Sequence, residues 1–181
     1  MIIGFLGKKG SGKDTIAKML IDNDDYIKYA FADPLKNSLK ELFGFDDEQL
    51  DGDKKEAIDN NWNVTPREVM QFFGTEIMQY KIQELIPDCK RNFFVKRFEN
   101  FIKKSTNKNI IVTDVRFQHE VDSILKNSGI VIKINRINNN NNFIEHQSEK
   151  DIENIINFSY EINNNDTQDM AYKKIISFIS L

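Results

Sequence analysis

The chain has 181 residues, and its 25 basic and 28 acidic side chains give a formal net charge of −3. This length fits one domain with its own hydrophobic core, and the mild negative charge excludes a general attraction to nucleic acid or to an anionic membrane surface. The single cysteine, Cys89, excludes a disulfide framework within the chain. No apolar run approaches the roughly 20 residues of a membrane span, so we expect a cytoplasmic protein.

Five short apolar runs predict buried strands, and amphipathic segments between them predict helices. The runs are 1–6, 26–31, 110–112, 130–134 and 158–162. Apolar strands that alternate with helices are typical of a parallel sheet covered on both faces.

Two of the predicted helices begin with a capping residue followed by proline. Asp33 precedes Pro34, and Thr65 precedes Pro66 in a helix that we expect to run to about Leu85. The segment 45–61 is acidic and aperiodic, which predicts a surface excursion. The run 138–142 consists of asparagine and cannot pack a core, which predicts a polar loop.

Residues 7–13 satisfy the pattern G-x-x-x-x-G-K between an apolar strand and an amphipathic helix. Glycines let the backbone curl so that several N–H groups point at one phosphate, and the following helix adds its positive end. Lys13 supplies a charge for the β- and γ-phosphates. Lys8 and Lys9 add positive charge beside the loop. The context predicts a nucleotide-binding phosphate loop rather than an inert glycine-rich turn.

The residue after Lys13 is Asp14, where this pattern usually has serine or threonine. Asp14 has two equally favoured roles: a ligand of the magnesium hydration shell, or a carboxylate placed favourably at a helix N-terminus. Thr15 is the better candidate for an α-phosphate contact.

Further motifs follow the loop in a consistent order. After 10–15 they occupy 33–36, 65–75, 94–96, 113–120 and 146–149, with Arg136 before the last. Together they resemble the motifs of the phage-type deoxynucleoside monophosphate kinases. The resemblance implies an α/β P-loop kinase fold, with a parallel five-stranded sheet flanked by helices. It also implies one domain over 1–181, with a helical acceptor-binding region at about 34–105 and a lid at about 136–152.

The loop chemistry and the resemblance together suggest roles for individual residues. Catalytic roles are expected of Lys13, Arg116 and Arg136, and metal binding of Asp14 and Asp114. Donor binding is expected of Lys8, Lys9, Gly10, Ser11, Gly12, Lys13, Asp14, Thr15 and, through its backbone rather than its side chain, Asn164. Acceptor binding is expected of Lys36, Arg67, Gln71, Gly74, Thr75, Arg91, Lys96, Asp114, Arg116, Glu120 and Ser148.

Three of these assignments have plain structural alternatives. Gly74 costs helix stability unless something approaches the backbone closely, and that neighbour is either an acceptor or another helix. Arg67 lies on the same predicted face and is otherwise a surface arginine. Asp114 lies at the carboxyl end of a strand, where ligands of α/β sheets bind, but it also suits an N-cap. His119 is expected to be structural.

The predicted activity is transfer of the ATP γ-phosphoryl group, with Mg²⁺, to a deoxynucleoside 5′-monophosphate. The partners are then small-molecule nucleotides, in a monomer or homodimer, in the cytoplasm of the cell or of a virus's host. Two alternatives remain: a small-molecule kinase of the phosphomevalonate type, which resembles the same lysine–aspartate loop, and a non-catalytic regulatory protein that binds ATP.

Overall fold

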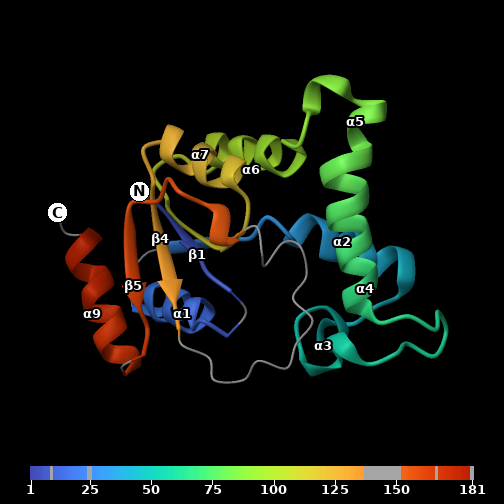
Figure 1. Cartoon of the computed structure of the whole chain (residues 1–181), viewed down its shortest axis with the longest axis horizontal. Helices are drawn as coiled ribbons and strands as arrows, with labels where there is room; N and C mark the ends of the chain where they lie inside the picture. The colour runs from blue at the N-terminus through green and yellow to red at the C-terminus, as the bar shows by residue number, and fades with distance from the viewer. Residues whose placement is uncertain (9, 24–25, 137–151, 166, 180–181) are drawn as a thin grey trace. The chain divides into compact units, whose positions relative to one another are not determined.

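The computed structural model describes residues 1–8, 10–23, 26–136, 152–165 and 167–179. The chain divides into two compact units (Figure 1). The first unit consists of Met1–Phe31 and Phe98–Leu181, and the second of Ala32–Arg97.

The first unit contains a parallel five-stranded sheet, as the sequence predicted. Its strands are β1 (Ile2–Leu6), β2 (Tyr26–Tyr29), β3 (Asn109–Val115), β4 (Ile130–Asn135) and β5 (Tyr160–Asn163). They lie in the order β2-β3-β1-β4-β5, and every neighbouring pair is parallel. The carboxyl ends of the strands therefore meet at one edge of the sheet, where ligands of this fold class bind.

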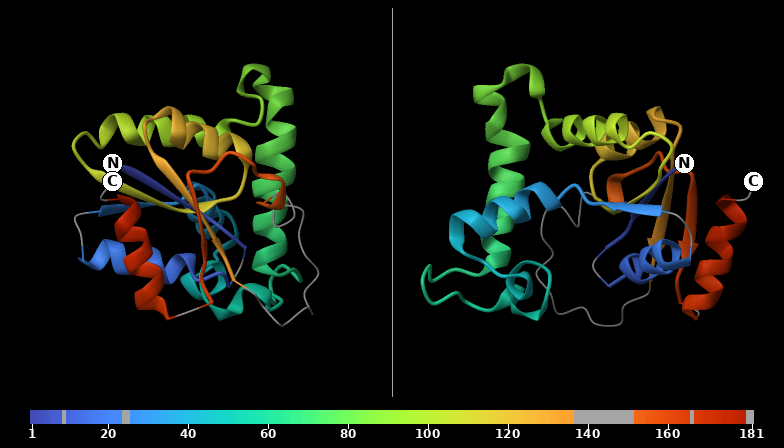
Figure 2. Two further views of the ribbon diagram at one scale, coloured as in Figure 1. Left: turned by 60° about the vertical axis from the view of Figure 1, so that its left-hand side comes forward. Right: turned by 180° about the vertical axis from the view of Figure 1, so that it is seen from behind.

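Helices cover both faces of the sheet. The helices α1 (Lys13–Asn23) and α9 (Gln168–Ile179) lie side by side on one face (Figures 1 and 2). On the other face, α7 (Gln118–Lys126) contacts β1 and β4. Gly4 of β1 faces α7, since a Cβ on it would lie 2.6 Å from Ile124 Cδ1. The short helix η4 (Ile152–Asn154) also belongs to this unit.

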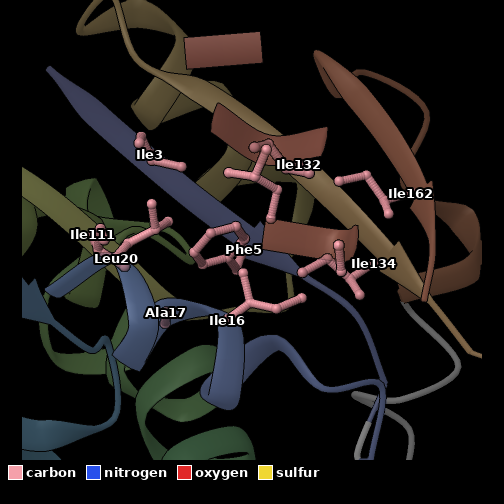
Figure 3. Close-up of a cluster of buried hydrophobic side chains, with 11 residues drawn as sticks. Ile3, Phe5, Ile16, Ala17, Leu20, Ile111, Ile132, Ile134 and Ile162 are labelled. Atoms are coloured by element: carbon pink, nitrogen blue, oxygen red, sulfur yellow. The ribbon is translucent and has the colours of Figure 1, made fainter. Parts of the chain in front are cut away.

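The main core lies between the sheet and the pair α1 and α9. Figure 3 shows Ile3 and Phe5 of β1 directed toward Ile16 and Leu20 of α1. These side chains are fully buried. Alternate residues of β1 therefore face opposite layers, because side chains alternate along a strand. The core fixes the position of the segment that joins β1 to α1.

The second unit is helical. Its elements are α2 (Asp33–Phe43), α3 (Asp47–Leu50), η1 (Asp53–Glu56), α4 (Pro66–Gln71), η2 (Phe72–Lys81), α5 (Ile82–Leu85), η3 (Pro87–Cys89) and the first residues of α6 (Phe93–Lys104). Leu39, Phe45, Leu50 and Val69 form its buried core. No helix in the described parts of either unit is long and apolar enough to cross a membrane.

Two sequence predictions for this unit need correction. The N-cap of α2 is Ala32 without a side-chain hydrogen bond, so Asp33 is the first helical residue, where its charge favours the helix dipole. The segment 45–61 is not simply a surface excursion, because Phe45 is buried just before the short helix α3 and Leu50 is buried as its last residue. One helical turn is too short to produce a visible period in the sequence.

The predicted helix from Thr65 to about Leu85 is confirmed, with one difference. Thr65 forms a capping box with Glu68, and Pro66 is the first helical residue, as expected. The central ten residues, Phe72–Lys81, are π-helical. The wider turn changes which residues share a face, so the shared face expected of Arg67 and Gly74 from α-helical spacing does not extend beyond Gln71. Thr75 and Gln79 are the buried residues of the π-helical segment.

Candidate active site

The phosphate loop connects β1 to α1 at the carboxyl edge of the sheet. Gly10 and Gly12 have φ angles of +80° and +91°, which side-chain-bearing residues rarely adopt. The turn is closed by a hydrogen bond of 3.1 Å from Ser11 N to Lys8 O. The first bond of the helix, also 3.1 Å, runs from Ile16 N to Gly12 O. The loop thus curls as the sequence predicted, and α1 begins directly at Lys13.

Two polar side chains of the loop are buried. Lys13 is only 5% exposed, and its Nζ lies 3.5 Å from Lys8 O and 4.0 Å from Asp14 Oδ2. Ser11 is 3% exposed, and its Oγ has no hydrogen-bond partner within the described chain. A buried hydroxyl without a partner is unfavourable, and a bound oxyanion would satisfy it. A cradle with a lysine and an unpartnered hydroxyl therefore fits a phosphate group.

The other predicted donor residues lie around this cradle. Lys8 forms an ion pair with Glu153 of η4, and the hydrogen bond from Lys8 lowers the pKa of the Glu153 carboxyl. Asp14 and Thr15 are exposed on the first turn of α1, so the structure is compatible with either role expected for Asp14. Lys9 lies outside the described residues. Glu153 is 145 residues away from Lys8, and no local sequence signal indicated it.

Asn164 makes a contact that the sequence analysis did not anticipate. Only a backbone role was expected of it, but its side chain is buried and its Nδ2 donates to Ser11 O at 2.8 Å. The contact joins the end of β5 to the phosphate loop.

The end of β3 brings three other predicted residues together. Asp114 Oδ1 accepts a hydrogen bond of 2.8 Å from Phe31 N. Glu120 Oε2 accepts bonds of 2.8 Å from Arg116 N and 3.1 Å from Phe117 N. The N-cap of α7 is Phe117 rather than Asp114, so the capping alternative for Asp114 does not hold.

Glu120 is a buried carboxyl of this cluster with a strongly perturbed pKa. Its burial raises the pKa of the side chain to about 8, and the negative charge of Asp114 contributes in the same direction. Its two backbone hydrogen bonds fix the turn that carries Arg116. The ring of the neighbouring His119 stacks on Phe117, as expected of a structural residue. Arg136, at the end of β4, is exposed.

In the second unit, four of the predicted acceptor residues have partners within the chain. Lys36 Nζ lies 2.5 Å from Asp51 Oδ1, and Arg67 pairs with Glu56. The Arg91 guanidinium lies 4.9 Å from the centre of the Tyr80 ring. The fourth residue, Lys96, donates a long bond of 3.4 Å from its Nζ to Asp88 O.

The remaining acceptor candidates described in this unit lie on the long helix that α4, η2 and α5 form together. Gln71 is partly buried in α4, and Thr75 is buried in η2. A Cβ at Gly74 would lie 2.9 Å from Leu35 Cδ2, the flexible end of a side chain of α2, so a small shift of Leu35 would relieve this contact and the acceptor role of Gly74 stays a prediction. Ser148 lies outside the described residues.

The parallel sheet, the curled loop after its first strand and the buried lysine are the features of a P-loop kinase fold. A solved structure of shikimate kinase from Aquifex aeolicus shares the fold, with a TM-score of 0.51 at 14% identity, over 99% of this chain and 96% of that one. A sequence profile described as deoxynucleotide monophosphate kinase matches residues 1–57 and 45–175.

Two viral relatives agree with that match. A protein of Acanthamoeba polyphaga mimivirus, provisionally named a deoxynucleotide monophosphate kinase, is 37% identical over 99% of this chain and 96% of its own length. The deoxynucleoside-5′-monophosphate kinase of Escherichia phage T5 is 36% identical over 36% of this chain and 29% of its own. The chain belongs to the deoxynucleotide monophosphate kinase family and is a phosphotransferase, which confirms the class of activity that the motifs predicted.

Proposed function

We propose that the chain transfers the γ-phosphoryl group of ATP, in the presence of Mg²⁺, to a deoxynucleoside 5′-monophosphate. The observation that carries the donor assignment is the loop between β1 and α1. It combines two glycines at positive φ, a buried lysine and a buried hydroxyl for which the described part of the chain offers no partner. An oxyanion is the ligand that such a group of donors suits. The products are ADP and the deoxynucleoside diphosphate.

In this proposal, catalysis comes from position and charge. The acceptor phosphate is already an anionic nucleophile, so no strong general base is required. Lys13 stabilises the charge on the transferring group, and Arg116 and Arg136 add positive charge to the same groups. The hydrogen bonds of Glu120 support Arg116 by fixing its backbone.

Magnesium would be held at Asp14 or Asp114, both carboxylates at the carboxyl edge of the sheet. Mg²⁺ commonly binds through one or two carboxylates, several waters and the substrate phosphates, and this pair fits that pattern. When bound, the ion neutralises charge on the donor phosphates. Thr15 is the proposed α-phosphate contact.

The acceptor is proposed to bind the second unit through Lys36, Arg67, Gln71, Thr75, Arg91 and Lys96. Charge supports this assignment, because four of the six side chains are cationic and an acceptor phosphate is anionic. Gly74 is proposed to leave room for the nucleoside on the same helix, since the Leu35 tip beside it can shift. We further propose that the two units are parts of one kinase domain with a lid at about 136–152, acting as a cytoplasmic monomer or homodimer.

A screen of ADP release tests the proposed function. The reaction contains ATP, Mg²⁺ and one acceptor at a time, taken from all deoxynucleoside and ribonucleoside monophosphates, with phosphomevalonate as a further acceptor. We expect ADP release to increase strongly with at least one deoxynucleoside monophosphate and not with phosphomevalonate. Slow ADP release that no acceptor stimulates would contradict the proposal and favour a regulatory ATP-binding protein.

A further inference from the structure

Asn164 connects the end of β5 with two other parts of the first unit. Its backbone N–H donates to Asn135 O at 2.7 Å, which extends the pairing of β4 and β5 by one bond. Its side chain, in a residue only 6% exposed, crosses to the phosphate loop and donates from Nδ2 to Ser11 O at 2.8 Å. A buried amide held in this way has a fixed orientation, because both its backbone and its side chain are bonded.

The same contact also restricts which residue fits at position 12. A Cβ on Gly12 would lie 2.2 Å from Asn164 Nδ2, closer than any side chain tolerates. Asn164 thus occupies the space that a side chain at position 12 would need. The positive φ of Gly12 requires glycine independently, so the backbone conformation and the close approach of Asn164 act at one residue.

The bond to Ser11 O also determines the direction of a loop N–H. The Ser11 carbonyl and the Gly12 N–H belong to one planar trans peptide, in which they point in opposite directions. When Asn164 holds the carbonyl on one side, it directs the Gly12 N–H to the other. The start of the loop is restrained as well, since a Cβ at Gly7 would lie 2.5 Å from Ile134 O of β4.

We propose that Asn164 is a positioning residue, which holds the phosphate loop in the conformation that binds the donor phosphates. It acts through the Ser11–Gly12 peptide and does not read the donor base, since its side-chain amide is directed at the loop. This inference rests on the proposed function, because it assumes a nucleoside triphosphate donor. It assigns the Asn164 side chain a role that no local sequence pattern indicated.

Three variants test the inference. Asn164→Ala removes the donor to Ser11 O, and Asn164→Asp keeps the shape but places a carboxylate against that carbonyl. Asn163→Ala is the matched control, because Asn163 is the preceding asparagine and its side chain is exposed. The measurements are binding of inorganic tripolyphosphate by calorimetry, kinetics with ATP and with GTP as donors, and thermal unfolding without ligand.

We expect Asn164→Ala to weaken tripolyphosphate binding and to raise the KM for ATP roughly tenfold each, the size of one net hydrogen bond. Asn164→Asp should weaken both further, and Asn163→Ala should match the wild type. The acceptor KM and the ratio of ATP to GTP use should not change. A merely structural role would lower thermal stability without this selective loss for phosphate.

Two results would overturn the inference. One is a folded Asn164→Ala protein that binds tripolyphosphate as the wild type does. The other is a changed preference between ATP and GTP with unchanged tripolyphosphate binding, which would make Asn164 a contact of the base. A wild type that binds tripolyphosphate but does not use ATP would contradict the proposed function instead, and the titrations would still decide the role of Asn164.

Discussion

The phosphate loop of the first unit and the helix from Pro66 to Leu85 in the second unit differ in whether contacts within the chain account for their residues. In the loop, Ser11 Oγ is buried without a partner among the described residues, and two glycines adopt positive φ. On the helix, Arg67 is paired with Glu56, and Leu35 occupies the space beside Gly74. Ser11 Oγ lacks a partner in the described part of the chain, and a ligand would supply one, whereas Arg67 and Gly74 have neighbours within their own unit.

Two kinds of observation can therefore indicate that a residue binds a ligand. An unsatisfied buried group points to a ligand on physical grounds alone, because leaving it without a partner is unfavourable. A satisfied residue points to a ligand only through its resemblance to a family motif. The donor side of the site is therefore supported by its geometry, and the acceptor side by family membership and charge. Variants that affect one side and spare the other test this division.

The largest effect is expected at Lys13. Lys13→Ala should lower turnover by roughly 10³-fold, the scale of a cation that stabilises a transferring phosphoryl group. This corresponds to about 4 kcal/mol of barrier. Lys18→Ala is the control, since Lys18 lies on the same helix in an exposed pair with Asp22. Steady-state kinetics of both variants decide the matter, and near-normal turnover of a folded Lys13→Ala protein would refute the role.

Substituting alanine for Gly12 in the phosphate loop and for Gly74 on the helix compares the two regions directly. Gly12→Ala forces a side chain onto a positive φ and against Asn164, so ATP binding should weaken by about 100-fold, equivalent to ~3 kcal/mol of strain. Gly74→Ala meets only the tip of the Leu35 side chain and gains helix propensity, so stability should change little. A methyl group in the space proposed for the nucleoside should raise the acceptor KM by about tenfold or more.

Titration of ATP and measurement of acceptor KM check both glycine variants. If Gly74→Ala left both the fold and the acceptor KM unchanged, the acceptor would not approach the helix backbone at that position. Packing against Leu35 would then be the reason for this glycine.

Arg67 provides the sharpest test of the acceptor side. Arg67→Ala should reduce kcat/KM for the acceptor by about 10- to 150-fold, since a charge-assisted bond to phosphate contributes about 1.5–3 kcal/mol. ATP binding should be unchanged. Glu56→Gln, which removes the charge of the partner, should leave acceptor use equal or better. Equal losses in both variants would show that the Arg67–Glu56 pair serves only the fold.

The smallest expected effect is the contribution of Glu120 to the pH dependence of the free energy of unfolding. Burial raises the pKa of Glu120 from an ordinary 4.5 to about 8, so the folded chain holds a proton that the unfolded chain releases. The free energy of unfolding should therefore fall as the pH rises from about 4.5 to 8. Urea titrations at pH 5 and 8 should show a smaller fall in Glu120→Gln, and an identical fall in both proteins would contradict this cause.

Elements with strong local signals could be predicted from the sequence. The buried strand has an apolar run, the phosphate loop after it has a glycine–lysine motif, and the helix at Thr65–Pro66 has a cap followed by proline, and all three are confirmed. The π-helical stretch of Phe72–Lys81 could not be predicted, because its side chains fit an α-helical period about as well.

Contacts between distant residues left no local signal. Asn164 and Ser11 are 153 residues apart, and nothing near either residue indicates their hydrogen bond. The same is true of Gly74, whose neighbour Leu35 lies on another helix. The sequence could identify the candidate phosphate loop, but not the Asn164 side chain that contacts it.

The central claim is that the phosphate loop delivers a phosphoryl group to a deoxynucleoside monophosphate. Phosphorus NMR of the chain with ATP, Mg²⁺ and the preferred acceptor tests it directly, because each phosphate is observed separately. We predict that ADP and the deoxynucleoside diphosphate appear in equal amounts, without inorganic phosphate, and that Lys13→Ala abolishes both signals on the same timescale. Accumulation of inorganic phosphate without a deoxynucleoside diphosphate would contradict the account.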